Sequence, residues 1–264
     1  MSKIDSTNSS RNIREDIRRG NITGPTNGLA PGYIQCNILI LPKEYAEDFT
    51  RFCELNRRAC PLLASSNAGD PGLPTLSDDI DIRSDLSGYS VFKNGELKQT
   101  RQDIHDLWRD DFVTFAFGCS FSFEEVLVEE GVNLAYLERG DSAALFYTNI
   151  DTEQAGPFCG KIAVSMRPLQ PKDAIKAILV TSQYPGVHGE PIHIAHPEMI
   201  GIADIEKPIQ SLTQTRLLDD ELPVFWACGV TSQLAVEQAK LPLCITHASA
   251  HMLITDIRLD QLKK

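Results

Sequence analysis

Two cysteines, Cys119 and Cys228, each lie where an apolar run gives way to small and hydroxyl residues. Cys119 follows the run in FVTFAFGCSFS, and Cys228 follows the run in PVFWACGVT. Such runs are typical of buried strands, and the hydroxyl residues after them are typical of helix starts. A helix start stabilises thiolates and binds anions through its free N–H groups and partial positive charge. The alternative is that both cysteines only fill the core and that the hydroxyl residues only cap helices.

A histidine follows the next apolar run along the chain. His247 lies in LCITHASAHMLITD, and residues 232–240, between Cys228 and this run, have the apolar spacing of a short helix. Strand, helix and strand in this order predict a βαβ unit with two parallel strands. Because open α/β sheets bind ligands at the carboxyl ends of their strands, we expect Cys228 and His247 to lie together in a ligand site.

Three histidines and a glutamate lie close together in VHGEPIHIAHP, residues 187–197. They are His188, Glu190, His193 and His196. Imidazole and carboxylate groups are ligands of divalent metals such as Mn²⁺ and Zn²⁺, although this spacing matches no zinc signature. Histidine also titrates near neutral pH and acts as a general base without a metal. The loop is therefore consistent with a metal site and with acid–base catalysis.

Two arginines are candidates to bind a substrate carboxylate. Arg83 lies among four aspartates in DDIDIRSDL, and Arg167 directly follows an apolar run in SMRPL. A guanidinium binds a carboxylate through two parallel hydrogen bonds, but Arg83 could equally form a salt bridge within a solvated acidic loop. Ser122 and Glu125 also fit an S-x-x-E capping box. The polar residues expected to complete the substrate-binding set are Ser120, Ser122, Thr231 and Asn149.

Composition excludes several classes of protein. The chain has 264 residues, enough for one large domain or two modest ones, and its net charge of −11 argues against a nucleic-acid-binding surface. Apolar runs fall short of the ~18–20 residues of a membrane span, and the first residues lack the apolar core of a signal peptide. The seven scattered cysteines suit a reducing compartment, so we expect a cytoplasmic protein. Nucleotide-binding glycine motifs, G-x-S-x-G and H-E-x-x-H do not occur.

The order of predicted elements indicates the fold class. Helices and strands alternate at both ends of the chain, whereas the middle is richer in strands. We therefore expect an α/β fold, with a mostly parallel sheet core, helices on both faces and an inserted smaller α+β lobe. Residues 1–20 would be a flexible segment, residues 21–131 and 205–264 the core domain, and residues 132–204 the lobe.

Several long motifs occur here in the order seen in one known family. GPTNGLAPGYIQCN, SDDIDIRSDLSGYSVFKNGEL, FVTFAFGCSFSFEE, GKIAVSMRPL, VHGEPIHIAHPEMIGI, PVFWACGVTSQ and ITHASAHMLITD together resemble the D-glutamate cyclase family, whose bacterial members carry hydro-lyase labels. The resemblance runs from about residue 11 to about residue 256. It implies two α/β lobes and cyclisation of D-glutamate to 5-oxo-D-proline with loss of water. The chain departs from the family pattern at His196, where an acidic residue is usual, and near Ala250 and His251, where glycine is usual.

These observations predict a hydro-lyase that cyclises a small acidic amino acid by acid–base catalysis. The candidate catalytic residues are His188, His193, Cys228, His247 and Cys119, and the candidate carboxylate clamps are Arg83 and Arg167. A thioester on Cys228 is less favoured, because forming one from a free carboxylate without ATP is uphill.

Two other functions remain open at this stage. They are a metal-dependent hydrolase built on His188 and His193, and a non-catalytic protein that binds acidic metabolites. No motif in the sequence requires a cofactor. If the histidine loop binds a divalent metal, Mn²⁺ and Zn²⁺ are the candidates. The expected partners are the small acidic substrate and a second copy of the chain in a homodimer, without nucleic acid or membrane.

Overall fold

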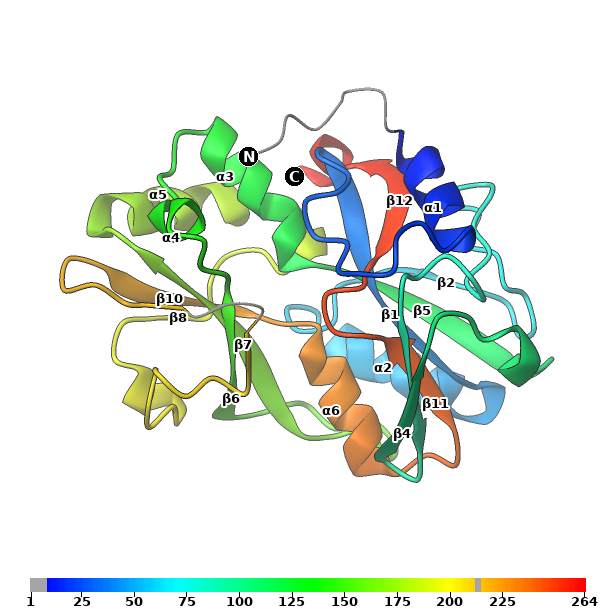
Figure 1. The fold of residues 1–264 in the computed structure, drawn as a ribbon. Helices are drawn as coiled ribbons and strands as arrows, with labels where there is room; N and C mark the ends of the chain where they lie inside the picture. Colours follow the sequence, from blue (N-terminus) through cyan, green and yellow to red (C-terminus); the bar gives the residue numbers. More distant parts are fainter. Residues whose placement is uncertain (1–8, 212–214) are drawn as a thin grey trace.

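The computed structural model describes residues 9–211 and 215–264 and contains two sheets that lie side by side (Figure 1). The first has seven strands, in the order β2-β5-β1-β11-β3-β4 with β12 also paired to β1. Its strands are β1 (Tyr33–Pro42), β2 (Leu62–Ser65), β3 (Tyr89–Lys93), β4 (Glu96–Arg101), β5 (Phe112–Gly118), β11 (Cys244–His247) and β12 (Leu253–Arg258). The second has five strands, in the order β8-β10-β7-β6-β9. Its strands are β6 (Ala144–Asp151), β7 (Lys161–Leu169), β8 (His193–Ile194), β9 (Gln210–Ser211) and β10 (Leu222–Ala227).

The expected parallel sheet is wrong, because every strand pair within the described residues is antiparallel. The wrong prediction concerns helix α6 (Val230–Ala239), which connects β10 to β11 and was expected to join two parallel strands of one sheet. These two strands belong to different sheets, so α6 crosses from the five-stranded sheet to the seven-stranded one instead of closing a βαβ unit. Alternation along the chain does not by itself show which strands pair.

Strand β1 is the centre of the larger sheet. Nine of its ten residues are buried, as its apolar sequence YIQCNILILP predicts. It pairs with β5 along one edge. Two strands share its other edge: β12 lies opposite residues 33–36, and β11 lies opposite residues 39–40. Asn37 and Ile38 therefore lie at the gap between β11 and β12, where residues 248–252 leave the sheet.

The helices cover the sheets from several sides. The α-helices are α1 (Ser10–Arg18), α2 (Ala46–Leu55), α3 (Glu124–Glu129), α4 (Ala135–Glu138), α5 (Pro171–Thr181) and α6. The 3₁₀ helices are η1 (Lys43–Tyr45), η2 (His105–Leu107), η3 (Ser120–Phe123), η4 (Pro185–Val187), η5 (Pro197–Ile200) and η6 (Leu259–Leu262). Helices α3, α4 and α5 gather on the five-stranded sheet, α1 packs on β12, and α6 lies between the two halves (Figure 1). Within the described ranges, no helix is both long and apolar enough to cross a membrane.

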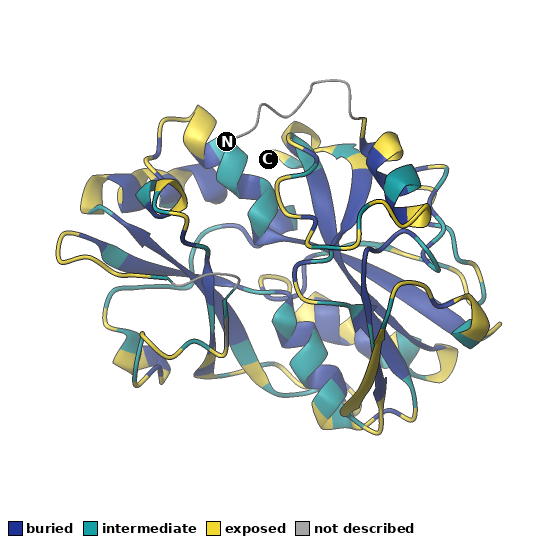
Figure 2. Ribbon diagram, in the orientation of Figure 1, coloured by how far each residue is buried: buried dark blue, intermediate teal, exposed yellow. Residues whose placement is uncertain are grey.

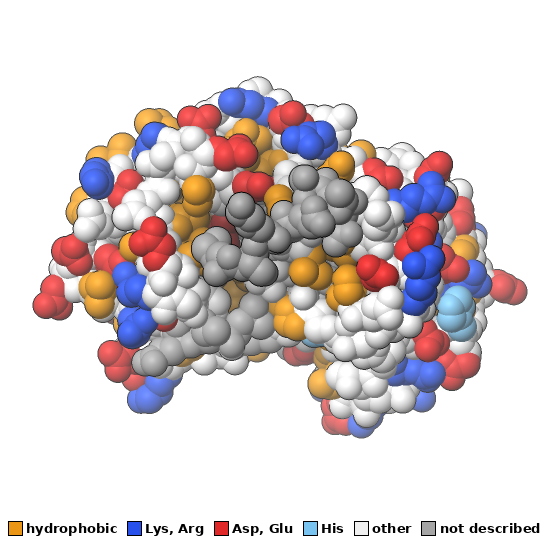
Figure 3. Space-filling view, turned by 45° about the horizontal axis from the view of Figure 1, so that its top comes forward, with side chains coloured by type: hydrophobic (Ala, Val, Ile, Leu, Met, Phe, Trp, Pro, Cys, Tyr) orange, Lys and Arg blue, Asp and Glu red, His pale blue; other side chains and the backbone are white. Residues whose placement is uncertain are grey.

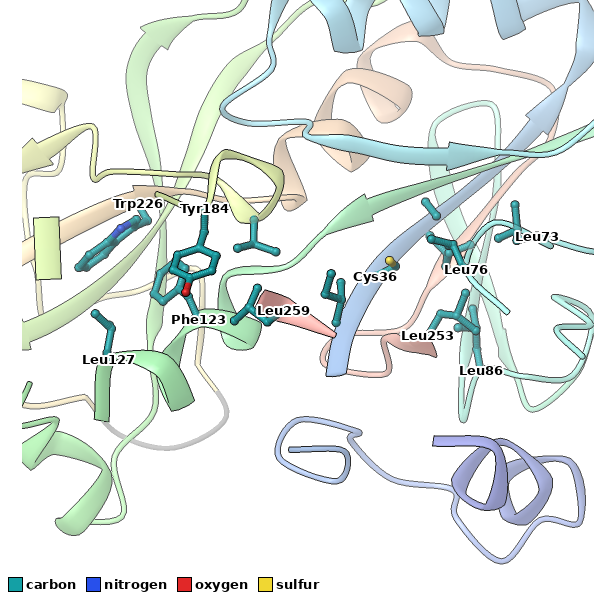
Figure 4. Close-up of a cluster of buried hydrophobic side chains, with 14 of the residues drawn as sticks. Cys36, Leu73, Leu76, Leu86, Phe123, Leu127, Tyr184, Trp226, Leu253 and Leu259 are labelled. Carbon is teal, nitrogen blue, oxygen red and sulfur yellow. The ribbon is translucent and has the colours of Figure 1, made fainter. Parts of the chain in front are cut away.

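One continuous apolar core joins the two sheets. It runs from Trp226 and Phe123 on the five-stranded side, past Leu259, to Cys36 and Leu253 on the seven-stranded side (Figure 4). Figure 2 shows that buried residues fill the central strands of both sheets, among them β1, β5, β7 and β10, whereas the edge strand β4 is exposed. Because apolar burial is the main stabilising contribution to folding, this shared core fixes the two sheets relative to each other.

The acidic segment around residues 78–86 is tied to helix α1. The fully buried guanidinium of Arg14 contacts Asp79 and Asp256, and Arg18 contacts Asp79 and Asp85. Buried charges require partners, so these aspartates neutralise the arginines of α1. On the face shown in Figure 3, acidic and basic side chains are interspersed over both halves, so the net charge of −11 is not concentrated there.

Candidate active site

A cavity of about 300 Å³ lies between the two sheets. It is bounded by β1, β7, β11, α6 and the loop of residues 248–252. Side chains with hydrogen-bonding or acid–base capacity line it. They are Asn37, Ser90, Cys119, Ser120, Ser165, Ser211, Cys228, Gln233, Glu237, His247 and Ser249. A concave space with a few converging polar groups is the usual form of a small-molecule site.

Asn37 holds together the two cysteine-containing turns. Its side-chain Nδ2 donates a hydrogen bond of 3.2 Å to the carbonyl of Gly118, just before Cys119. A Cβ on Gly229, just after Cys228, would collide with the same amide group. Gly118 is itself confined, because a Cβ there would overlap the carbonyl oxygen of Gly186. The two turns thus meet over one side chain, and Gly229 is needed for that close approach, whereas Gly118 is needed for the close approach of residues 186–187.

Both cysteine thiols are protonated at neutral pH. Burial raises the pKa of Cys119 to about 12, with the N–H of Phe121 acting in the opposite direction. Burial also raises the pKa of Cys228, while the N–H groups of Val230 and Gly229 and the charge of Arg167 act to lower it. The favourable hydrogen bonds do not overcome desolvation, which disfavours the charged form.

A cation lies behind the cavity wall: Arg167, which is completely buried on β7. Its Nη1 donates to Ser165 Oγ at 3.1 Å, and its Nη2 donates to Ser120 Oγ at 3.3 Å. Because side chains alternate along a strand, Ser165 and Arg167 share one face of β7. The two serines therefore separate the guanidinium from the cavity and present hydroxyl groups that it polarises.

Glu124 and two aromatic rings keep Arg167 charged. Arg167 Nη2 lies 2.6 Å from Glu124 Oε1, and the guanidinium carbon lies 4.8 Å from the Phe123 ring centroid and 5.5 Å from that of Trp226. Burial acts to lower the pKa of Arg167, but the Glu124 carboxylate outweighs it and the pKa is raised. The arrangement is a buried ion pair with cation–π contacts.

His247 is held by the backbone of Ile38 at the gap in the β1 edge. Its Nδ1 lies 3.1 Å from the Ile38 N–H nitrogen and 3.3 Å from the Ile38 carbonyl oxygen. The N–H holds the tautomer that carries the proton on Nε2, and the carbonyl holds the tautomer that carries it on Nδ1. Burial lowers the pKa of His247 to about 4, so the imidazole is neutral at physiological pH. Either tautomer is therefore anchored, which lets Nε2 donate or accept a proton.

Helix α6 contributes a carboxylate to the cavity. Val230, Gln233 and Glu237 line it at the spacing of one helix face, and Gln233 Nε2 donates to Glu237 Oε1 at 3.0 Å. Among the described lining residues, Glu237 is the one carboxylate, and no lysine or arginine reaches the surface of the cavity. The site thus has an anionic side at α6, opposed by the cation behind Ser120 and Ser165.

Comparison with known proteins identifies the family of this chain. The family model for D-glutamate cyclase matches residues 113–256. A relative from Afipia carboxidovorans named "Putative hydro-lyase" is 51% identical over 95% of this chain and 92% of its own length. Relatives of the same name from Bordetella petrii and Verminephrobacter eiseniae are 50% and 52% identical, over 92% and 94% of this chain and 92% and 90% of theirs.

The chain belongs to the D-glutamate cyclase family. This confirms the resemblance found in the sequence and makes the protein a lyase. The matched region contains Cys119, Arg167, Cys228 and His247, and Asn37 lies outside it.

The cavity of this cyclase-family protein brings together four residues that the sequence singled out, Cys119, Ser120, Cys228 and His247. Arg167 lies directly behind Ser120. Although β10 and β11 are not neighbours, both end at the cavity, because α6 carries the chain across from one sheet to the other.

Two other predicted substrate-binding residues contact backbone instead. Ser122 Oγ accepts from the Gln35 N–H at 3.1 Å, and Glu125 accepts from the Gly32 N–H, so the predicted capping box is wrong. Ser122 thus contacts β1, and Glu125 contacts the segment that precedes β1. Thr231 Oγ1 accepts from the Ala163 N–H at 3.0 Å and fastens α6 to β7.

The remaining predicted residues lie outside the cavity lining. Arg83 forms two hydrogen bonds of 2.8 and 2.7 Å with Asp81, and Asn149 is exposed on β6. His188 is buried with Nδ1 2.7 Å from the Arg58 carbonyl, whereas His193 Nε2 lies 3.0 Å from the His196 carbonyl. The histidines thus have separate backbone partners. Within the described residues, the one group of potential metal ligands is Asp78, Asp79 and Asp256, of which the last two contact Arg14.

Ser165, Gln233 and Glu237 line the cavity but were not among the residues predicted from the sequence. Two features of the sequence could have identified them. Ser165 is two residues from Arg167 in a predicted strand and must share its face. Gln233 and Glu237 are four residues apart on the helix that follows Cys228, so they must share a face with each other.

Acid should weaken the fold through His188. Burial lowers the pKa of His188 to about 4, against an ordinary value of 6.5. Between these values the unfolded chain binds a proton that the folded chain does not, so the free energy of unfolding falls as the pH drops from about 6.5 to about 4. This histidine alone should account for about 3 kcal/mol of that loss.

The variant His188→Asn should reduce this pH dependence. Asparagine tolerates the left-handed backbone of position 188, where φ is 82°, and its amide can donate to the Arg58 carbonyl. Denaturant titrations at several pH values between 4 and 7 would measure the loss for both proteins. Equal losses in the variant and the original protein would contradict this assignment. His247 remains in both and contributes in the same direction.

Proposed function

We propose that this protein cyclises D-glutamate to 5-oxo-D-proline in the cavity between its sheets. In this reaction the amino nitrogen attacks the side-chain carboxyl carbon, a C–N bond forms, and a C–O bond breaks. The nitrogen loses two protons in the course of the reaction, and both end on the departing carboxylate oxygen, which leaves as water. The observation that carries the proposal is the polarity of the cavity, with Arg167 behind two hydroxyls and Glu237 on helix α6.

The α-carboxylate binds at Ser120 and Ser165. Their hydroxyl oxygens accept hydrogen bonds from Arg167 and lie 3.4 Å from each other, so one hydroxyl donates to the other and the remaining hydroxyl hydrogen donates into the cavity. A chain of hydrogen bonds that begins at a cation is strengthened by polarisation. The guanidinium thus stabilises the carboxylate through the serines without direct contact.

Glu237 binds the substrate ammonium and distinguishes an amino acid from a plain dicarboxylic acid. Its carboxylate lines the cavity, and Gln233 holds one of its oxygens. This arrangement fixes the amino group on the α6 side. It thereby limits the number of orientations that the flexible substrate can adopt.

His247 transfers the proton. The neutral imidazole removes a proton from the ammonium, so that the free amine can attack, and returns a proton to the departing hydroxyl. The Ile38 backbone anchors both tautomers, so neither step requires the ring to leave its position.

The start of α6 polarises the side-chain carboxyl group that is attacked. The N–H groups of Gly229 and Val230 face Cys228 at the cavity wall, and α6 is long enough to present a positive end there. Donors aimed at oxygen atoms that gain negative charge in the transition state are a major source of rate enhancement. The protonated thiols of Cys119 and Cys228 add two further weak donors.

The direct test is incubation of the purified protein with D-glutamate, followed by chromatography for 5-oxoproline. L-Glutamate in a parallel reaction measures stereochemical preference, and heat-denatured protein corrects for spontaneous cyclisation. We expect enzyme-dependent product from D-glutamate. The substrate assignment is contradicted if no product forms with or without added Mn²⁺ or Zn²⁺.

The variant Glu237→Gln should weaken substrate binding more than it slows turnover. Removing the charge that pairs with the ammonium should raise KM about 10- to 100-fold, the usual worth of a hydrogen bond between charged groups. Steady-state kinetics with D-glutamate would measure the change. Glu129→Gln, at an exposed position on α3, is the matched control and should leave KM unchanged. An unchanged KM in Glu237→Gln would remove Glu237 from the ammonium site.

A further inference from the structure

We propose that this enzyme also exchanges the Cα proton of its substrate and interconverts the D and L forms of an acidic amino acid, with Cys119 and Cys228 as paired acid–base groups. The proposal rests on the proposed function for the class of substrate and its orientation. It adds a second reaction at the same site, in which the thiols take the part that histidine takes in cyclisation.

The two thiols approach the cavity from different sheets. Cys119 directly follows β5 of the seven-stranded sheet, and Cys228 directly follows β10 of the five-stranded sheet. Both line the cavity that separates the sheets, and Asn37 lies between the two turns. A molecule bound there can contact one thiol from each sheet. A two-base inversion at a carbon atom uses two such groups, one to remove a proton and another to deliver a proton to the opposite face.

The other cysteines do not share this placement. Four of them are buried packing residues, namely Cys36, Cys53, Cys60 and Cys244. Cys159 is partly exposed and lines a separate surface pocket with Asp151 and Lys161. Of the seven free cysteines, Cys119 and Cys228 are the two that reach the cavity.

The surroundings of the thiols also support proton transfer. Burial raises the pKa of both thiols, and the charge of Arg167 acts to lower both; Cys228 has two backbone N–H groups that favour its thiolate, those of Val230 and Gly229, whereas Cys119 has that of Phe121. Cys119, Ser120 and Ser165 line the same cavity, so an α-carboxylate bound to the two serines places Cα within the space that the Cys119 thiol reaches. The same hydroxyls stabilise the negative charge that the carboxylate gains when Cα loses its proton.

The reaction balances without an oxidant or a cofactor. Because both thiols are protonated at rest, Cys228 first releases its proton to water. The resulting thiolate removes the Cα proton, so the C–H bond breaks, an S–H bond forms, and the electron pair moves into the α-carboxylate. The Cys119 thiol then donates its proton to the other face of Cα, which restores the carboxylate and leaves a thiolate on Cys119. The reverse reaction uses the same steps from the opposite enantiomer, and exchange of thiol protons with water introduces solvent hydrogen.

The test is to incubate the protein with D-glutamate in D₂O. Proton NMR follows loss of the Cα–H signal, chiral chromatography follows L-glutamate, and a separate assay follows 5-oxoproline. D-Aspartate is run in parallel, because its lactam would need a strained four-membered ring and its Cα exchange is therefore observed without cyclisation. We expect deuterium at Cα of both amino acids and formation of the L enantiomers.

Single variants separate the roles of the two thiols. Cys119→Ala and Cys228→Ala should each exchange the Cα proton of one enantiomer only, a different one for each variant. Both should lower the rate of inversion by about 100- to 10,000-fold, the usual contribution of an acid–base group. Cys159→Ala is the control and should behave as the original protein. Thermal unfolding of each variant shows whether it is folded, and the serine variants repeat the test where alanine lowers stability.

The outcomes distinguish this proposal from the proposed function. Cyclisation of D-glutamate without deuterium at Cα overturns the exchange reaction and leaves the cyclase assignment standing. Exchange of D-aspartate without cyclisation of D-glutamate supports the thiol pair and contradicts the cyclase assignment. Inversion at the original rate in both folded single variants overturns the two-thiol mechanism.

Discussion

Replacing Arg167 with methionine is expected to lower kcat/KM for D-glutamate about 100- to 1,000-fold and to destabilise the fold by about 3–5 kcal/mol. The activity loss follows because Ser120 and Ser165 would no longer be polarised by a cation. The stability loss follows because the Glu124 carboxylate would lose the ion pair that now lies at 2.6 Å. Steady-state kinetics and denaturant unfolding measure the two effects separately.

The double variant Arg167→Met with Glu124→Gln separates catalysis from folding. Its neutral glutamine leaves no unpaired carboxylate beside the apolar side chain, and the amide oxygen can still accept from the Tyr136 hydroxyl, which now donates to Glu124 at 3.0 Å. We therefore expect most of the lost stability to return while activity stays low. Recovery of activity together with stability would show that Arg167 acts only through folding.

The cysteine turns were predictable because their signal is local. An apolar run that ends at a small or hydroxyl residue marks the end of a buried strand, and both β5 and β10 end next to their cysteine. The pairing of strands is not local. It depends on which edges meet in three dimensions, so the same alternation of elements indicated parallel strands, whereas α6 joins two antiparallel sheets.

Charged residues show the same division between local and long-range information. Arg83 and Asp81 are two residues apart and form an ion pair, so the sequence already indicated an internal salt bridge as one alternative for Arg83. The contact of Arg14 with Asp256 joins residues far apart in the chain and has no sequence signal. Arg167 was selected for direct contact with substrate, but the alternation of β7 places Ser165 beside it, and Ser120 arrives from the other sheet.

Replacing His247 with glutamine should lower kcat for D-glutamate about 100- to 10,000-fold, because a general acid–base group is lost from the cavity. The fold should tolerate the change. A glutamine amide offers both an acceptor for the Ile38 N–H and a donor for the Ile38 carbonyl, the two groups that now hold Nδ1. His105→Gln, at an exposed position on η2, is the matched control and should keep its original kcat.

The pH profile of kcat gives His247 a signature that a structural residue would lack. Because burial lowers the pKa of His247 to about 4, the imidazole stays neutral down to that pH, and protonation below it removes the base. Activity of the original protein should therefore fall with a midpoint near 4, well below the ordinary histidine value of 6.5. The residual activity of His247→Gln should lack this acid limb. A midpoint near 6.5, or an unchanged acid limb in the variant, would exclude His247 as the base and return that role to another group facing the cavity.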